Sequence, residues 1–174
     1  AVYAFKGDVY SGLDADTIED DKFDYLQNTL RIISGYYGIL RPFDKILPYR
    51  LEMGTRLENE NGNNLYNFWG DKITDVLNDD IEDDDIVVNL ASDEYFKSIN
   101  KEKLNAEIIT PVFKEFKNDS YKVIAIYAKK ARGLMSRFLI ERKSKNVDDI
   151  KLFNTDGYTF DGNLSTENEL VFTR

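Results

Sequence analysis

Apolar residues recur at characteristic spacings along the chain, and these spacings predict its elements. Residues 1–6 alternate in the manner of a strand. Residues 20–33 carry apolar side chains at helical spacing behind Asp20 or Asp21, either of which can cap a helix. The pattern therefore predicts an acidic helix here, although Leu30–Ile33 can instead form a short buried strand.

A glycine-hinged turn at Ser34–Gly38 ends this region. Pro42 and Pro48 follow, and the residue before a proline is biased towards extended backbone. Residues 35–57 are therefore expected to form an ordered but irregular segment. Ordered loops of this length often carry function.

The middle of the chain predicts one firm amphipathic helix, with Asn63 or Asn64 as its cap. Its apolar positions are Leu65, Phe68, Trp69, Ile73, Val76 and Leu77. Six of the seven residues Asp79–Asp85 are acidic. A block of like charge is typical of a solvated loop, and a carboxylate metal site is the alternative interpretation.

Patterns typical of β-strands follow the acidic run along the chain. Ile86–Leu90 reads as a buried strand, and Ser92 can cap a short helix through Phe96. Residues 108–116 and 121–126 alternate like paired strands. Asn118-Asp119 is expected to form the turn between them, because both residue types tolerate the backbone of tight hairpins.

The last quarter of the chain predicts a long helix over residues 127–143, a short helix near 147–152 and strands near 158–160 and 170–173. We therefore predict an α+β fold forming a single domain over residues 1–174. It contains a mixed sheet, several helices and a long basic amphipathic helix near the C-terminus.

Composition excludes several kinds of chemistry. The chain has no Cys and no His, so disulfides, cysteine nucleophiles, His-based triads and ordinary zinc sites cannot form from its residues. We predict no metal and no cofactor. No apolar run approaches the length of a membrane span. The chain opens on Ala1 within an expected strand, which suggests that an N-terminal segment is missing.

Charge is strongly segregated in this acidic chain. The net charge is −9, yet residues 114–145 carry ten Lys or Arg against three Asp or Glu. On a helical wheel, the basic residues of the last long helix fall mostly opposite its apolar arc. The ridge consists of Lys129, Lys130, Arg132, Arg137, Lys143 and Lys145. It predicts either an anion-binding surface or a solvated face that balances local acids.

Two glycine features could serve such a surface. Gly133 lies within the helix, where glycine costs about 1 kcal/mol against alanine; a ligand's close approach or tight packing on a neighbouring strand would explain it. Gly35 and Gly38 can present backbone N–H groups to a phosphate, and a following helix start and Arg41 would add positive charge. A plain tight turn is the alternative.

Carboxylates in Gly-, Pro- or aromatic-rich segments are the candidates for acid–base chemistry. They are Asp8, Asp14, Asp44, Glu52 and Glu94. The sequence does not indicate which of them, if any, lie close together.

Several strings together resemble the YaaA peroxide-stress resistance family across essentially the whole chain. In chain order they are Gly7–Ala15, Ser34–Pro42, Pro48–Gly54, Phe68–Gly70, Asn89–Ser92, Glu94–Phe96 and Ala128–Gly133. Family members also carry an upstream Pro-Ala-Lys-Thr motif, which is absent here.

The resemblance implies a cytosolic bacterial protein, induced by peroxide, that limits free iron and so limits iron-driven damage. It also implies a positively charged cleft and a helix-hairpin-helix-like element that binds DNA. We therefore expect DNA, duplex or single-stranded, as the partner. The expected phosphate-binding residues are Gly35, Gly38, Arg41, Arg50, Lys129, Lys130, Arg132 and Arg137.

The alternative is an enzyme that acts on a nucleic acid base or a phosphorylated small molecule. In that case Asp8, Asp14, Glu52 or Glu94 would supply the acid–base chemistry. Direct iron handling ranks last, because a selective iron site is hard to build without His or Cys.

Overall fold

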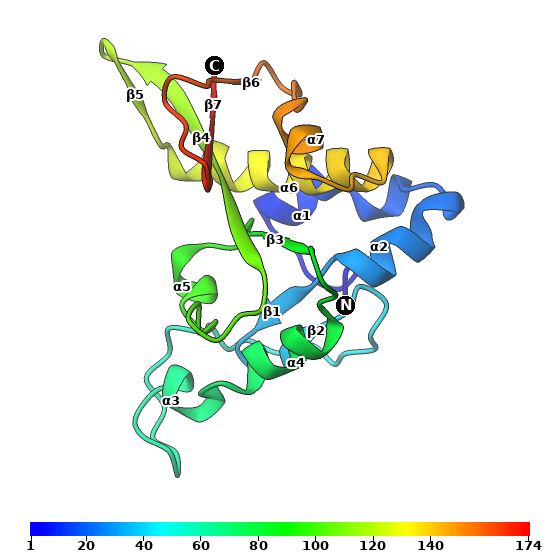
Figure 1. Cartoon of the computed structure of the whole chain (residues 1–174). Helices are drawn as coiled ribbons and strands as arrows, with labels where there is room; N and C mark the ends of the chain where they lie inside the picture. Colours follow the sequence, from blue (N-terminus) through cyan, green and yellow to red (C-terminus); the bar gives the residue numbers. More distant parts are fainter.

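The computed structural model describes residues 1–174 and has the predicted α+β fold in a single domain (Figure 1). The α-helices are α1 (Asp8–Leu13), α2 (Phe23–Thr29), α3 (Leu65–Trp69), α4 (Lys72–Asp80), α5 (Asp93–Phe96), α6 (Ala125–Arg142) and α7 (Val147–Lys151). Short 3-10 helices lie at Ala15–Thr17 and Asp20–Lys22. The strands are β1 (Ile32–Ser34), β2 (Gly38–Leu40), β3 (Ile86–Val88), β4 (Glu107–Lys117), β5 (Ser120–Lys122), β6 (Thr159–Phe160) and β7 (Glu169–Thr173).

The main sheet is mixed and is organised around β4. Strand order is β3-β4-β7-β6, with β5 paired to the far end of β4. β4 runs parallel to both β3 and β7, whereas β5 and β6 pair antiparallel with their neighbours. β1 and β2 form a separate antiparallel hairpin. In Figure 1 the β4–β5 hairpin projects away from the rest of the molecule.

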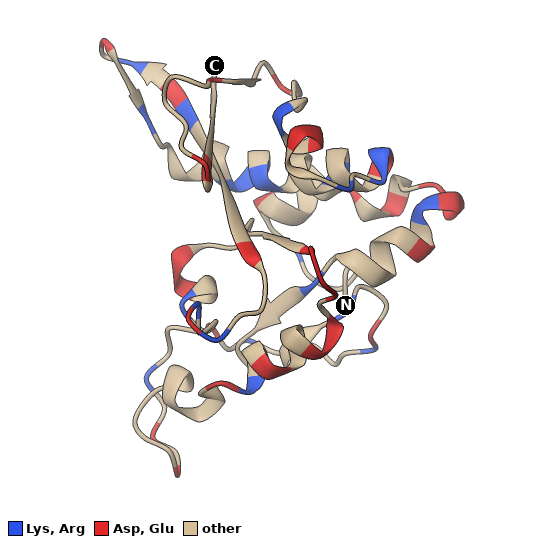
Figure 2. Ribbon diagram, in the orientation of Figure 1, with Lys and Arg blue, Asp and Glu red and all other residues tan.

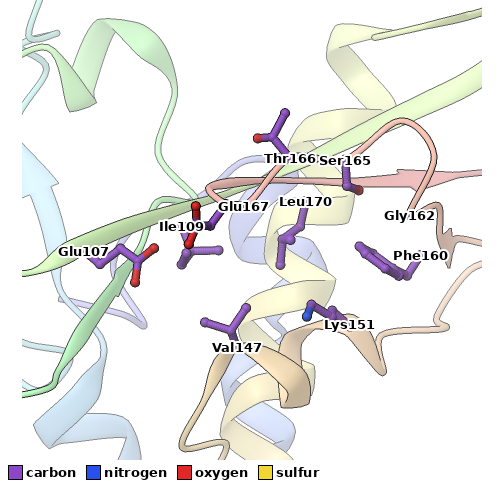
Figure 3. Close-up of a pocket in the computed structure, with 10 residues that line it drawn as sticks. All are labelled: Glu107, Ile109, Val147, Lys151, Phe160, Gly162, Ser165, Thr166, Glu167 and Leu170. Carbon is purple, nitrogen blue, oxygen red and sulfur yellow. The ribbon is translucent and has the colours of Figure 1, made fainter.

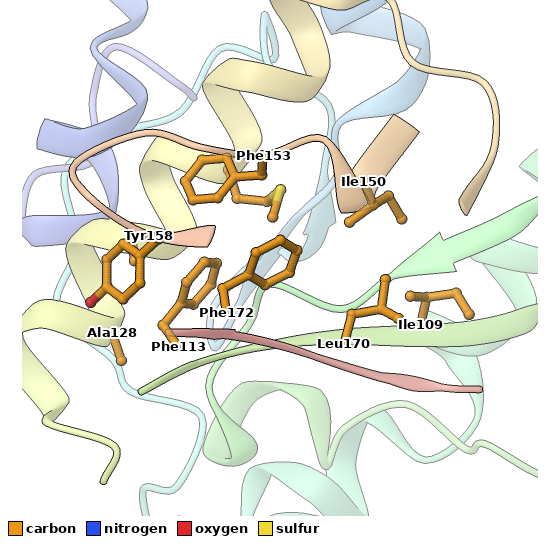
Figure 4. Close-up of a cluster of buried hydrophobic side chains, with 10 residues drawn as sticks. Ile109, Phe113, Ala128, Ile150, Phe153, Tyr158, Leu170 and Phe172 are labelled. Carbon is orange, nitrogen blue, oxygen red and sulfur yellow. The ribbon is translucent and has the colours of Figure 1, made fainter. Parts of the chain in front are cut away.

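Three apolar clusters hold the domain together. The first lies between β4, β7, α6 and α7, and several of its aromatic rings pack against each other, as Figure 4 shows. The second joins α1, α2 and the β1–β2 hairpin, and the third lies under α3, α4 and α5. Met135 of α6 belongs to the first cluster and Ile140 to the second, so α6 links two cores.

The structure corrects the predicted amphipathic form of α6, because this helix is buried on two sides. One side packs on β4 and the other on α1. Gly133 is buried where the two helices cross, and a Cβ there would lie 2.9 Å from Gly12 Cα and closer still to Val9 O. Packing therefore explains this glycine, although its neighbour is a helix rather than a strand.

Two other predicted elements are also wrong in detail. The opening residues form a turn instead of a strand. The helix expected from residue 65 to residue 77 is divided into α3 and α4 by Gly70, whose φ of 50° lies outside the helical region. The Asn64 cap is confirmed, since its side chain accepts a hydrogen bond from Asn67 N.

Local signals in the second half are confirmed. Asn118 and Asp119 have φ of 52° and 57°, as a tight hairpin turn requires, and they connect β4 to β5. α7, β6 and β7 lie where the spacing predicts them. The second strand of the hairpin is shorter than expected because α6 already begins at Ala125. None of the helices combines the length and apolar character needed to cross a membrane.

Candidate functional site

Segments far apart in the sequence meet where α1, the 34–54 segment, α5 and α6 come together. A Cβ on Gly35 would lie 2.5 Å from Leu51 O, and one on Gly54 would lie 3.0 Å from Glu94 Oε1. One on Gly12 would lie 2.9 Å from Leu134 N. The first two approaches join Ser34–Pro42, Pro48–Gly54 and Glu94–Phe96, and the third joins Gly7–Ala15 to Ala128–Gly133. The side chain of Tyr10 lies near those of Tyr49 and Tyr95, which brings the two groups together. We call this region the motif junction and define it by Tyr10, Tyr49, Asp93, Tyr95 and Arg132.

Tyrosine side chains occupy the centre of the motif junction. Burial raises the pKa of Tyr10, and the nearby phenol groups of Tyr49 and Tyr95 raise it further. Burial also raises the pKa of Tyr95, and the charges of Glu94 and Glu52 act in the same direction. Tyr10, Tyr49 and Tyr95 thus come from three different segments, and Tyr49 and Tyr95 lie close enough to affect the ionisation of Tyr10.

The turn glycines have packing roles. Trp69 Nε1 donates to Gly35 O at 3.0 Å, and Tyr37 N donates to Ser34 Oγ at 2.9 Å. Gly38 has a φ of 77°, and a Cβ there would lie 2.7 Å from the Trp69 ring. The expected helix start after the turn is wrong, since β2 follows it and supplies no helix N-terminus.

Two of the predicted arginines already have protein partners. Arg41 pairs with Asp80 at 2.6 Å, and Asp80 also pairs with Arg31 at 2.8 Å. Arg137 donates to Asp14 O at 2.8 Å and to Thr17 Oγ1 at 2.7 Å, and its Nε pairs with Glu141 at 2.6 Å. Arg137 therefore holds the end of α1 against α6.

Of the remaining predicted cations, Lys129, Arg50 and Arg132 form no ion pair, whereas Lys130 forms a long ion pair with Asp156. Lys129 and Arg50 are exposed, and Lys130 lies 3.8 Å from Asp156. Arg132 is half-buried, with no ion pair and no hydrogen bond from its guanidinium. Burial lowers the pKa of Arg132, while the charge of Asp93 acts in the opposite direction. An anion bound here would offset the cost of burying this charge.

The predicted carboxylates are not gathered into one acid–base pair. Glu94 Oε1 accepts from Gly54 N at 2.8 Å, and Glu52 is exposed; both act on Tyr95. Asp14 ends α1 with a φ of 47° and accepts from Thr17 Oγ1, and Asp8 is exposed in the first turn of α1.

Asp93 is the carboxylate whose charge acts on Arg132 of the basic helix α6. It was not singled out from the sequence. It follows the cap position of a four-residue helix, and no motif distinguishes it from the other exposed acids. The Asp79–Asp85 run divides between α4 and an exposed turn. No group of three or more Asp or Glu side chains is arranged to hold a metal ion.

Unpaired lysines also extend from α6 onto the hairpin. Lys114, Lys117 and Lys122 form no ion pairs, and Figure 2 shows basic positions along the hairpin strands and α6. In the same view, acidic positions are prominent on α4 and α5 and in nearby loops. The positive charge therefore continues from the motif junction side of α6 to the projecting strands.

The surface has two open hollows, one away from the motif junction and one beside it. One of about 500 Å³ is bounded by β4, α7 and the 160–170 loop, as Figure 3 shows. Its only cation, Lys151, pairs with Asp148 at 2.9 Å, and Glu107 and Glu167 disfavour an anion there. The other, of about 710 Å³, adjoins Asp93 and carries charges of both signs.

Comparison with protein families gives one match. The model of the family described as "Peroxide stress protein YaaA" matches residues 1–164 of the 174-residue chain. The match includes every residue of the motif junction and the whole β4–β5 hairpin.

Proposed function

The chain belongs to the YaaA family of peroxide stress proteins, and we propose that it serves the peroxide stress response by binding DNA. The phosphate backbone is held by Lys129, Lys130, Arg132 and Arg50, at the edge of the motif junction. The observation that carries the proposal is the half-buried Arg132 guanidinium, which forms no direct ion pair or hydrogen bond within the chain and has only the more distant charge of Asp93 to offset its burial.

A half-buried cation without an ion pair is costly unless an anion completes the site. Phosphate suits this position, because guanidinium groups bind phosphate oxygens bidentately and the neighbouring lysines add charge without directional demands. Lys129 and Lys130 precede Arg132 on α6 and are exposed. A phosphate held by Arg132 would therefore have further cations close by.

In binding of this kind the protein contacts the DNA backbone more than the bases. We expect weak sequence preference and a steep dependence on salt, since each neutralised phosphate releases condensed counterions. The net charge of −9 makes the rest of the surface repel DNA. Contact is thereby confined to the side that carries the unpaired cations.

Counterion release also offers a route to limiting iron-driven damage. Ferrous ions associated with DNA phosphates generate oxidising species next to the bases when peroxide is present. Lysine and arginine side chains that neutralise those phosphates displace their counterions. Protection by this route needs no metal site in the protein, and it covers only the DNA that the protein occupies.

Fluorescence anisotropy tests the proposal with labelled duplex and single-stranded oligonucleotides across a salt series. Lys129→Ala/Lys130→Ala should weaken binding to both and flatten the salt slope. Lys72→Ala/Lys103→Ala removes the same charge near α4 and should leave the slope unchanged. An Arg132→Gln variant, which keeps the side-chain bulk, should weaken binding in low salt as well. Equal slopes for all proteins would refute the assignment.

A nicking assay addresses the iron step. Supercoiled plasmid treated with ferrous iron and peroxide should be protected by the wild-type protein in proportion to DNA occupancy. The Lys129→Ala/Lys130→Ala variant should protect only at the higher concentrations that restore occupancy. Protection by this variant at wild-type concentrations would contradict the displacement route.

A second candidate function rests on the charges that act on Arg132 and on Tyr95 in the motif junction. Glu52 and Glu94 act on the Tyr95 hydroxyl, and Asp93 acts on Arg132. This arrangement suits an enzyme in which Arg132 anchors a phosphorylated substrate and Glu52 or Glu94 transfers a proton. Two results would favour this enzyme. Phosphorylated nucleosides should compete with DNA for the wild type and not for Arg132→Gln. The wild type should also turn these nucleosides over, and Glu52→Gln should not.

A further inference from the structure

We propose that the β4–β5 hairpin is a base-stacking platform, on which Phe116 and Tyr121 bind unpaired bases of single-stranded DNA. Lys114, on the same face of the hairpin, holds a phosphate beside the stacked bases, and Lys117 and Lys122, on the opposite face, add positive charge to the hairpin. The inference rests on the proposed function, since it adds base contacts to a protein that binds the DNA backbone.

The two rings form a pair that no other element covers. Phe116 is paired in register with Tyr121, and the ring centroids lie 5.2 Å apart at an angle of 64°. The exposed fractions are 60% for Phe116 and 44% for Tyr121. An exposed aromatic pair of this kind contributes nothing to the three apolar clusters, in which neither residue takes part.

The hairpin has a second apolar feature beside these rings. The β7 strand pairs with β4 as far as Lys114, and Arg174 extends this pairing by accepting a hydrogen bond from Phe116 N at 2.9 Å, so the hairpin is two-stranded only beyond Phe116. Val123 and Ile126, in the connection to α6 and its first turn, are more than half exposed. The aromatic pair therefore belongs to a projecting surface that solvent or a ligand reaches freely (Figure 1).

The charge around the rings favours a polyanion. Lys114 lies two residues before Phe116, so its side chain is on the same face of the hairpin as the rings, and it forms no ion pair. Lys117 and Lys122 are the chain neighbours of Phe116 and Tyr121 and lie on the opposite face, and neither has an ion pair. The nearby Glu115 is neutralised, because Arg174 Nε pairs with its carboxylate at 2.9 Å and Tyr158 also donates to it. Asp119 at the turn is then the one uncompensated acid of the hairpin.

Unpaired bases are the ligand that fits exposed rings with a lysine on the same face and further lysines on the opposite face of the hairpin. Every base has a π-face, so stacking tolerates any sequence, while the lysines contact the backbone. A duplex hides these faces within its own stack and would gain only the lysine contacts. The platform therefore predicts a preference for single strands that the cations of α6 alone do not create.

Anisotropy with two labelled probes of equal length tests this inference: oligo(dT), and an abasic oligomer that has the same phosphates and no bases. Phe116→Ala/Tyr121→Ala should weaken binding of oligo(dT) on the order of tenfold or more. Its affinity for the abasic oligomer and its salt slope should stay at wild-type values. Phe116→Tyr/Tyr121→Phe, which keeps both rings, should bind oligo(dT) like the wild type.

Val76→Ala/Leu152→Ala serves as the matched control, because it removes two exposed apolar side chains elsewhere (47% and 54% exposed). It should leave both affinities unchanged. Unchanged affinity of Phe116→Ala/Tyr121→Ala for oligo(dT) would overturn the inference alone, as would equal losses on both probes. A wild-type dimer that this double variant dissociates would also overturn it, since the rings would then bind a second copy. Failure of the wild type to bind either probe would refute the proposed function and the platform with it.

Discussion

Replacing Gly133 with alanine tests the packing of α1 on α6, because this packing decides whether the substitution raises or lowers the free energy of unfolding. In an open helix the substitution would stabilise the protein by about 1 kcal/mol, because alanine is the better helix former. In this structure the new Cβ would lie 2.8 Å from Leu13 N and 2.9 Å from Gly12 Cα, and closer still to Val9 O. These are backbone atoms, so no side chain can rotate away.

Relief of this overlap requires the two helices to separate by about 1.5 Å at Val9, the difference between this closest approach and an ordinary contact distance. Overpacking of this kind costs about 1–3 kcal/mol, and occasionally more. Because the overlapping atoms are backbone atoms, we expect a cost at the upper end of that range. After the gain in helix propensity, we expect a net loss of about 2 kcal/mol. This corresponds to a fall in Tm of about 4–8 °C for a domain of this size.

Thermal and urea unfolding, followed by far-UV circular dichroism and Trp69 fluorescence, measure the loss. Lys129→Ala is the control, since it changes an exposed position of the same helix and should shift stability by less than about 0.5 kcal/mol. Gly12→Ala should behave like Gly133→Ala, because its Cβ would meet the backbone of α6. A Gly133→Ala protein more stable than the wild type would refute the close approach of the two helices.

Three further outcomes follow from the contacts of single residues. Arg137→Ala should lower the unfolding free energy by about 2 kcal/mol, because it leaves carbonyl groups at the end of α1 without their charged donor. Urea unfolding measures this loss, and a variant as stable as the wild type would contradict the contact. Gly38→Ala should destabilise the protein and shift the emission of Trp69, since φ is 77° and the Cβ would overlap the indole ring; an unchanged emission spectrum would count against the contact. Burial works to raise the pKa of Asp80, but Arg31 and Arg41 outweigh it and hold the pKa below its usual value. The stability that this ion pair contributes is present above about pH 4 and is lost as pH falls through the lowered pKa. The Tm of an Asp80→Asn protein should therefore fall less than that of the wild type between pH 7 and pH 3. Equal falls in Tm would refute the ion pair.

Elements with local causes could be predicted from the sequence. The Asn118-Asp119 turn and the Asn64 cap depend on residues within a few positions, and both are confirmed. The division of the α3–α4 region also has a local cause at Gly70, but a glycine inside a helical pattern is often tolerated. Periodicity alone therefore favoured one continuous helix.

The environment of α6 could not be predicted, because the element that covers its second side lies more than a hundred residues earlier. Ile140 fell outside the apolar arc on the helical wheel, and it packs in the cluster that α1 helps to form. That mismatch was the available signal of a second buried side. Similarly, Arg41 and Arg137 look like free cations in the sequence, and their partners are remote in the chain.

Of the residues that define the motif junction, only Arg132 was expected from the sequence to bind a ligand; the tyrosines lie in strings noted there but were not singled out as site residues. The quoted strings contain Tyr10, Tyr49, Tyr95 and Arg132, and the fold brings them together. Their convergence depends on close backbone approaches at Gly12, Gly35 and Gly54. Glycine content alone does not reveal which partner a given glycine approaches.

The most direct test of the central claim is the salt dependence of DNA affinity for Lys129→Ala/Lys130→Ala beside the wild type and Lys72→Ala/Lys103→Ala. If the cations of α6 hold the backbone, the logarithmic slope for duplex DNA should flatten by about 0.9 for each lysine that neutralises a phosphate. The control should retain the wild-type slope. Identical slopes for all three proteins, or wild-type protein that fails to bind DNA at low salt, would contradict the account.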